Sequence, residues 1–108
     1  MTDIERILQS EYNFEFDEIR KKMMTTSYYK YGSIKENYRT GKTIDAIKSL
    51  KMRIAKYEET GNVEFLADAG NFCMIEFTFP QHKNAHYKPS DSGTCRVAGM
   101  GVNEIKRL

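Results

Sequence analysis

The sequence predicts an all-α fold: one four-helix bundle-like domain with an irregular C-terminal extension. Its 108 residues are the length of a single domain. No proline, the residue that most strongly breaks helices, occurs before Pro80. Apolar side chains recur at helical spacing up to that point. We therefore divide the domain into a helical body, residues 1–79, and a loop-like extension, residues 80–108, where Gly, Pro, Ser and Asn accumulate.

The first two helices are predicted over residues 3–10 and 13–31. The first has apolar side chains at i, i+3 and i+4 and begins on an acidic residue, which a helix N-terminus favours. Asn13 is the expected N-cap of the second helix, and Gly32 its stop. Residues 33–42 are polar and are predicted to form a loop with at most one helical turn. The apolar face of the second helix is expected to comprise Tyr12, Phe16, Ile19 and Met23.

The third helix is predicted to begin at Thr43 and the fourth to run from Val63 toward Phe79, where Pro80 ends it. Gly61 ends the third helix, and the short link that follows predicts an antiparallel hairpin. The fourth helix is apolar on nearly all sides, so we expect it to be central and covered by the other helices or by a second subunit. A homo-oligomer is therefore predicted. The expected core stripe of the third helix is Ile47, Leu50, Ile54 and Tyr57.

Charge and cysteine content exclude several classes of protein. The net charge of +2 and pI of about 8.5 fall short of a dedicated nucleic-acid binder, so nucleic acid is not favoured as a partner. Two distant cysteines match neither a disulfide framework nor a zinc site. The N-terminus lacks the pattern of a signal peptide, and no apolar run is long enough to span a membrane. We expect a soluble, reduced, cytoplasmic protein without a membrane partner.

A polar stripe interrupts the apolar fourth helix. Glu64, Asp68 and Asn71 follow at i, i+4 and i+7 and therefore share one face. Glu15 and Glu18 share one side of the second helix and would face this stripe across an antiparallel packing. Such a cluster of oxygens suits Mg²⁺, which would position a phosphate for attack by water. The alternative is that these residues are solvent-facing charges, with the glutamates paired to Lys22.

The same residues carry a resemblance to a known family. The segment LADAGNF (residues 66–72), preceded by Glu64, and the E-x-x-E spacing of residues 15–18 resemble the MazG-like all-α nucleotide pyrophosphohydrolases. The resemblance implies Mg²⁺-dependent cleavage of nucleoside triphosphates to monophosphate and pyrophosphate in a helical dimer or larger oligomer. By position it makes metal ligands of Glu15, Glu18, Asp68 and Glu64, and makes Asn71 a contact either to the substrate or to a metal ligand.

A second resemblance covers more of the chain. The segments YYKYG, YEETGN and NFCMIEF and the H-x-x-x-H of the extension resemble a type of small bacteriophage or prophage protein, which implies a bacterial host cell.

Aromatic and cationic residues supply candidate substrate contacts. Tyr28 and Lys30 end the second helix, where stacking on a base and contact with phosphate are one use and core packing is another. Lys22 is a further candidate for the phosphate. In the extension, contacts to a nucleotide are expected if that segment folds over the body; otherwise it is a partner-bound or disordered arm. The candidates there are His82, His86 and Lys88.

Three functions remain open from the sequence. The leading hypothesis is a phage-type nucleotide-handling protein, a MazG-like Mg²⁺-dependent nucleoside triphosphate pyrophosphohydrolase. The second is a non-catalytic anti-defence protein that sequesters a nucleotide signal or binds and inhibits a host defence protein. The third is a structural oligomer or nucleic-acid accessory protein that uses a local basic patch.

Overall fold

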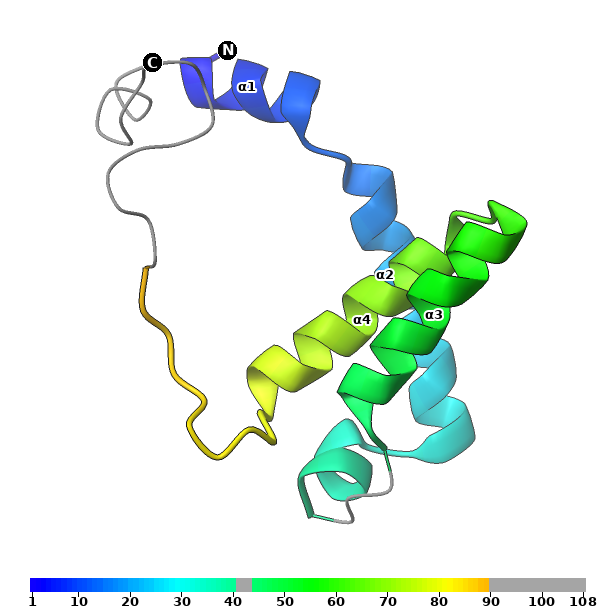
Figure 1. Cartoon of the computed structure of the whole chain (residues 1–108). Helices are drawn as coiled ribbons and strands as arrows, with labels where there is room; N and C mark the ends of the chain where they lie inside the picture. Colours follow the sequence, from blue (N-terminus) through cyan, green and yellow to red (C-terminus); the bar gives the residue numbers. More distant parts are fainter. Residues whose placement is uncertain (41–43, 90–108) are drawn as a thin grey trace.

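The chain is helical, and its helices are joined by short links (Figure 1). The computed structural model describes residues 1–40 and 44–89, and these contain no strand. The all-α prediction is therefore confirmed. The elements are the α-helices α1 (Asp3–Glu11), α2 (Phe14–Tyr31), α3 (Ala46–Thr60) and α4 (Glu64–Thr78), and one π-helix, η1 (Lys35–Thr40).

Local capping explains where most helices begin and end. Thr2 and Glu5 form a capping box at the start of α1. The side chain of Asn13 accepts a hydrogen bond of 2.8 Å from the Phe16 amide and so caps α2, as predicted. Gly32 and Gly61 end α2 and α3 with φ angles of 84° and 72°, a region that favours glycine.

One local prediction is wrong, and the structure refines another. The N-cap of α3 is Asp45, whose carboxylate accepts a 2.9 Å hydrogen bond from the Lys48 amide. Thr43, the predicted cap, lies outside the described residues. The segment predicted as a loop with at most one helical turn contains η1, a six-residue π-helix, and Tyr38 of this helix packs into the core with only 1% of its surface exposed.

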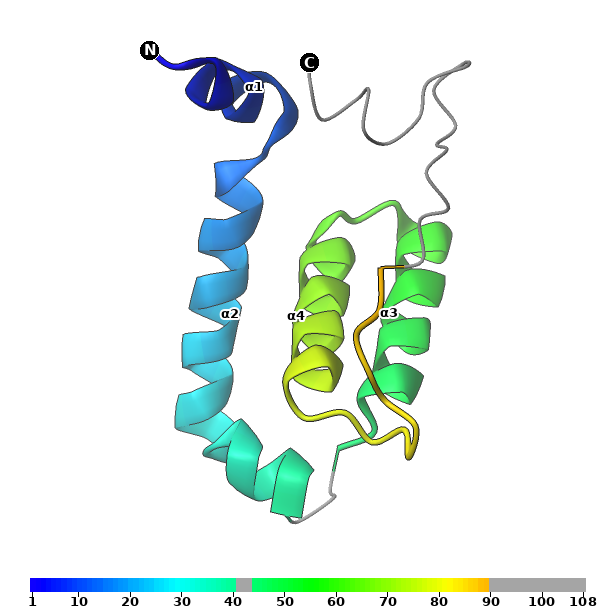
Figure 2. The same ribbon diagram turned by 90° about the vertical axis from the view of Figure 1, so that its left-hand side faces the viewer.

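Helix α4 is central, as its apolar composition predicts. It packs against both α3 and α2, and in Figure 2 it lies between them while α3 and α4 form a hairpin. A cluster of Tyr38, Ala46 and Ile75 forms the buried core beside the C-terminal end of α4. Pro80 follows that helix, and residues 80–89 contain no helix. None of the helices in the described ranges has the length and apolar content needed to cross a bilayer.

The predicted core stripe of α3 is wrong at two positions. Ile47 and Ile54 are exposed, whereas Ala46 is buried and Leu50 and Arg53 are partly buried. Helix α3 therefore turns a neighbouring stripe toward α4, one that contains Arg53. An arginine is tolerated there because it pairs with an acidic residue of α4, as described below.

Helix α1 does not complete a four-helix bundle. It contains no buried residue, and it extends from the N-terminal end of α2 (Figures 1 and 2). The packed unit of the described chain consists of α2, η1, α3 and α4.

Candidate ligand-binding cleft

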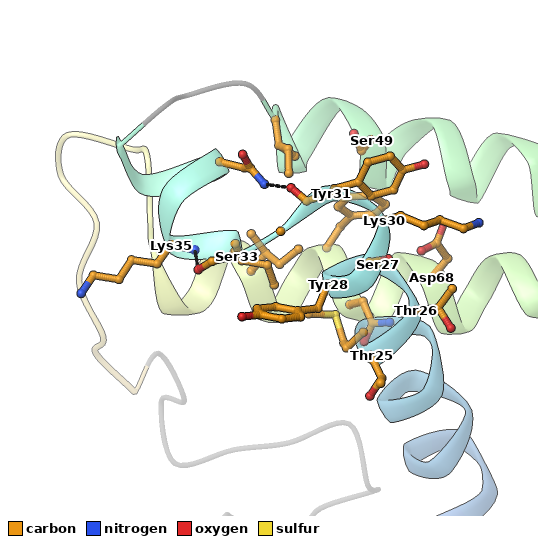
Figure 3. Close-up of a pocket in the computed structure, with 18 of the residues that line it drawn as sticks. Thr25, Thr26, Ser27, Tyr28, Lys30, Tyr31, Ser33, Lys35, Ser49 and Asp68 are labelled. Atoms are coloured by element: carbon orange, nitrogen blue, oxygen red, sulfur yellow. Dashed lines mark hydrogen bonds between the residues drawn. The ribbon is translucent and has the colours of Figure 1, made fainter.

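A cleft of 1190 Å³ opens between the C-terminal half of α2, the segment that follows it, and the facing sides of α3 and α4 (Figure 3). Its volume is somewhat above the range of about 300–1,000 Å³ that is typical of small-molecule sites. Gly32 turns the chain at the end of α2, so residues before and after the turn line the same space. The apolar part of the lining consists of Met24, Ile34, Ile44, Phe72, Ile75 and Phe79.

The rest of the lining is rich in hydroxyl groups and also contains cations. Tyr28, Lys30 and Tyr31 project from the last turns of α2 (Figure 3). In the part of the chain that the structure describes, Lys30 has no ion-pair partner. Hydroxyl groups both donate and accept hydrogen bonds, so the wall suits a polar, anionic ligand. These groups come from Thr25, Thr26, Ser27, Ser33 and Ser49 and from the tyrosines.

Asn71 is the buried polar residue of the cleft wall. Only 4% of its surface is exposed, and its Nδ2 donates a 3.3 Å hydrogen bond to the Arg20 carbonyl of α2. That carbonyl can only accept, which fixes the orientation of the amide. Oδ1 of Asn71 is left buried without a partner among the described residues. An unsatisfied buried oxygen costs about 1–3 kcal/mol, so its retention needs an explanation.

Arg53 and Asp68 join α3 to α4 at the edge of the cleft. The guanidinium Nε donates a hydrogen bond to Asp68 Oδ2, and the Arg53 guanidinium carbon lies 6.0 Å from the centroid of the Phe72 ring. Both charged side chains are about one-third exposed. The pair therefore sets the relative position of the two helices and places one cation at the cleft.

The structure brings together three of the seven predicted substrate contacts. Tyr28, Lys30 and Asn71 line the cleft. The other four lie elsewhere: Lys22 is exposed on α2, and the extension residues His82, His86 and Lys88 are exposed and do not line it.

The four predicted metal ligands do not converge on one site in the described chain. Asp68 lines the cleft but is paired with Arg53, Glu18 is paired with Lys21 at 3.1 Å, and Glu15 and Glu64 are exposed. Within residues 1–40 and 44–89, no three His, Cys, Asp or Glu side chains form a group that could hold a metal ion. Among the described residues the carboxylates thus supply no preformed Mg²⁺ site.

Sequence reasoning missed the hydroxyl residues and Arg53. The run Thr25–Ser27 stands directly before the tyrosines and was a usable signal, because three consecutive hydroxyl residues are unfavourable inside a helix without another role. Ser49 and Arg53 carry no local signal, since only the packing of α3 on α4 places them at the cleft.

Comparison with known proteins assigns the chain to no family. No protein-family model matches the chain, and no curated protein or solved structure is significantly similar to it.

Proposed function

We propose that this protein binds a nucleotide, or a nucleotide-derived signal, in the cleft between α2, α3 and α4 and holds it without chemical turnover. The observation that carries the proposal is the cleft itself, whose lining combines hydroxyl, aromatic, cationic and apolar groups. A nucleotide presents three matching parts: an aromatic base, a sugar with hydroxyls, and an anionic phosphate.

The lining provides a partner for each part. Tyr28 and Tyr31 offer ring faces for stacking, which contributes about 1–3 kcal/mol per base in single-strand binders. Lys30 offers an ammonium group for a phosphate, and the hydroxyl groups suit the sugar. Oδ1 of Asn71 would accept a hydrogen bond from an exocyclic amino group of the base. Because that oxygen is covered, the neighbouring side chains must separate when the ligand enters.

Sequestration is favoured over hydrolysis by the state of the carboxylates. Hydrolysis of a triphosphate needs a metal held by hard oxygens, and Asp68, the one predicted metal ligand at the cleft, is paired with Arg53. A phage origin and a host defence protein as partner remain predictions from the sequence.

The test uses two lysines of α2. Titration calorimetry with nucleoside mono-, di- and triphosphates, with the matching nucleosides and with inorganic phosphate identifies a ligand. Lys30→Ala is expected to weaken its binding by about tenfold, equivalent to the loss of one charge-assisted contact. Lys22→Ala, on the same helix but outside the cleft, is the matched control and is expected to change nothing.

A turnover assay separates the two forms of the nucleotide hypothesis. The protein is incubated with the bound triphosphate and Mg²⁺, and release of pyrophosphate is measured. We expect none. Pyrophosphate release that is lost in Asp68→Asn would support the pyrophosphohydrolase instead, and the absence of binding to every compound of the panel would reject the nucleotide proposal.

A further inference from the structure

The N-terminal arm, residues 3–19, leaves an apolar surface uncovered. It comprises α1, the link at Tyr12 and Asn13, and the first turns of α2. Ile4 is 71% exposed, and the other large apolar side chains of the arm are at least 37% exposed. An isolated helix of nine residues is marginal in water, so α1 needs a surface to pack against. The exposed apolar residues of the arm are Ile4, Ile7, Leu8, Tyr12, Phe14, Phe16 and Ile19, of which Phe16 also packs against α4 at Gly70.

The arm is held in this position by contacts at the link. The Tyr12 hydroxyl donates a hydrogen bond to the Asp17 carboxylate, and the Tyr12 ring packs edge-on against Phe14 at a centroid distance of 4.8 Å. Asp17 also accepts a 2.6 Å hydrogen bond from Arg20. The Tyr12 contacts join the link to the first turns of α2, and α1 extends from this link away from α3 and α4 (Figures 1 and 2).

Charge identifies the surface that the arm fits. The arm carries six carboxylates and one arginine, whereas residues 20–56 carry eleven Lys or Arg and two acidic residues. On α1, Ile4, Ile7 and Glu11 follow at i, i+3 and i+7 and therefore share one face. An acidic stripe of this kind disfavours an anionic lipid surface, for which a helix needs Lys and Arg.

The matching stripe is on α3 of the same chain. Ile47, Lys51 and Ile54 follow at i, i+4 and i+7, and all three are exposed. One stripe thus has isoleucines with a carboxylate, and the other has isoleucines with an ammonium group. The arm does not pack on the α3 stripe of its own chain. Helix α4 lies between α2 and α3 in Figure 2, and α1 extends away from them.

We propose that two copies of this chain form a symmetric dimer in which the N-terminal arm of each copy packs on the Ile47–Ile54 face of α3 in the other. The two contacts are identical and close on themselves, which limits the assembly to two chains. The exposed apolar residues of the arm offer on the order of 600 Å² per copy. Two arms then bury on the order of 1,200 Å² of arm surface, and the α3 faces add to it, which reaches the size of stable interfaces.

The first experiment measures mass by sedimentation under reducing conditions, because Cys73 is exposed. The wild type is expected at twice its 12.6 kDa mass, with weaker association at high salt. Ile7→Glu is expected to raise the dimer dissociation constant by at least about tenfold, because it places a carboxylate in the apolar contact. Gln9→Glu, on the opposite face of α1, adds the same charge and is expected to leave the dimer intact.

Two further variants test whether the dimer forms through the proposed contact between the arm and α3. Lys51→Glu on α3 is expected to weaken the dimer as Ile7→Glu does, and circular dichroism checks that both variants keep their helices. The chain has no tryptophan, so Leu8→Trp places a single fluorophore on the arm. The emission of this variant is expected to shift to shorter wavelength as the dimer forms. Three outcomes would each overturn the proposal: a wild type that stays monomeric, a dimer unaffected by Ile7→Glu or Lys51→Glu, or a Leu8→Trp dimer whose emission stays that of a water-exposed indole.

Discussion

Arg53 of α3 donates a hydrogen bond to the carboxylate of Asp68 of α4, across the two helices of the central hairpin. The pair accounts for two features of the molecule. It allows an arginine on the side of α3 that faces α4, and it occupies the carboxylate that the sequence suggested for a metal. Asp68, predicted from the sequence as a metal ligand, thus has a structural partner in the fold.

Removing this pair is expected to cost moderate stability. Asp68→Asn should lower the free energy of unfolding by about 1 kcal/mol, since both side chains are one-third exposed and solvent screens the charges. Urea denaturation measures the loss, and a double-mutant cycle with Arg53→Gln isolates the pairwise part. Glu59→Gln is the control, because the Lys56–Glu59 pair at 3.5 Å is more exposed. If Mg²⁺ raised the melting temperature of the wild type but not of Asp68→Asn, the carboxylate would be a metal ligand instead.

Asn71 is expected to lower the stability of the free protein and to raise its affinity for the ligand. Asn71→Leu removes the unpartnered Oδ1 and keeps a similar volume, so the free protein should be as stable as the wild type or more stable. Its affinity for the nucleotide identified by calorimetry should fall. Asn71→Asp should be less stable by about 2 kcal/mol or more, because it places a carboxylate oxygen against the Arg20 carbonyl. A strong loss of stability in Asn71→Leu would show that the amide serves the fold rather than a ligand.

Helix positions could be predicted from the sequence because their signals are local. Asn13, Gly32, Gly61 and Pro80 each set a boundary through the geometry of their own residue, and the structure has these boundaries. The start of α3 was misplaced because Thr43 and Asp45 are both suitable caps, and the choice depends on how the preceding segment packs.

The packing face of α3 and the full lining of the cleft could not be predicted, since both depend on long-range contacts. Ile47 and Ile54 form a regular apolar stripe, and nothing in their spacing tells a core stripe from a surface that awaits another chain. Tyr28 and Lys30 were found through their unusual clustering. Ser49 and Arg53 reach the same cleft only after α3 packs on α4.

The contact between Tyr38 and Glu76 predicts a loss of stability at alkaline pH. The buried hydroxyl of Tyr38 donates a hydrogen bond to the Glu76 carboxylate, and burial followed by this bond raises the pKa of Tyr38 above its usual value of 10.0. A raised pKa in the folded state stabilises the protein below pH 10, and this contribution is lost as the pH rises beyond that value.

Tyr38→Phe tests this contact. At neutral pH the variant should be less stable by about 1 kcal/mol, and the difference from the wild type should shrink above pH 10. Urea titrations across this range measure it, with the exposed Tyr29→Phe as control. A difference that stays constant with pH would mean that Tyr38 titrates normally.

Gly70 sets how closely α2 approaches α4. A Cβ atom at this position would lie 3.0 Å from Cζ of Phe16 and 3.1 Å from Cδ of Arg20. In Gly70→Ala the tip of the Phe16 ring and the Arg20 side chain at Cδ need to shift by only a few tenths of an ångström, and the gain in helix propensity of about 1 kcal/mol offsets the strain. We expect this variant to be close to the wild type in stability.

A larger side chain at position 70 cannot be accommodated by such small shifts of Phe16 and Arg20. Gly70→Leu must push α2 away from α4, and we expect a loss of about 2 kcal/mol or more in urea denaturation. Cys73→Leu, on the exposed side of α4, is the control and should change stability by less than about 0.5 kcal/mol. Since the cleft lies between α2 and α4, Gly70→Leu should also weaken nucleotide binding while Cys73→Leu leaves it unchanged. Equal stability of the two leucine variants would mean that α2 does not pack against α4 at Gly70.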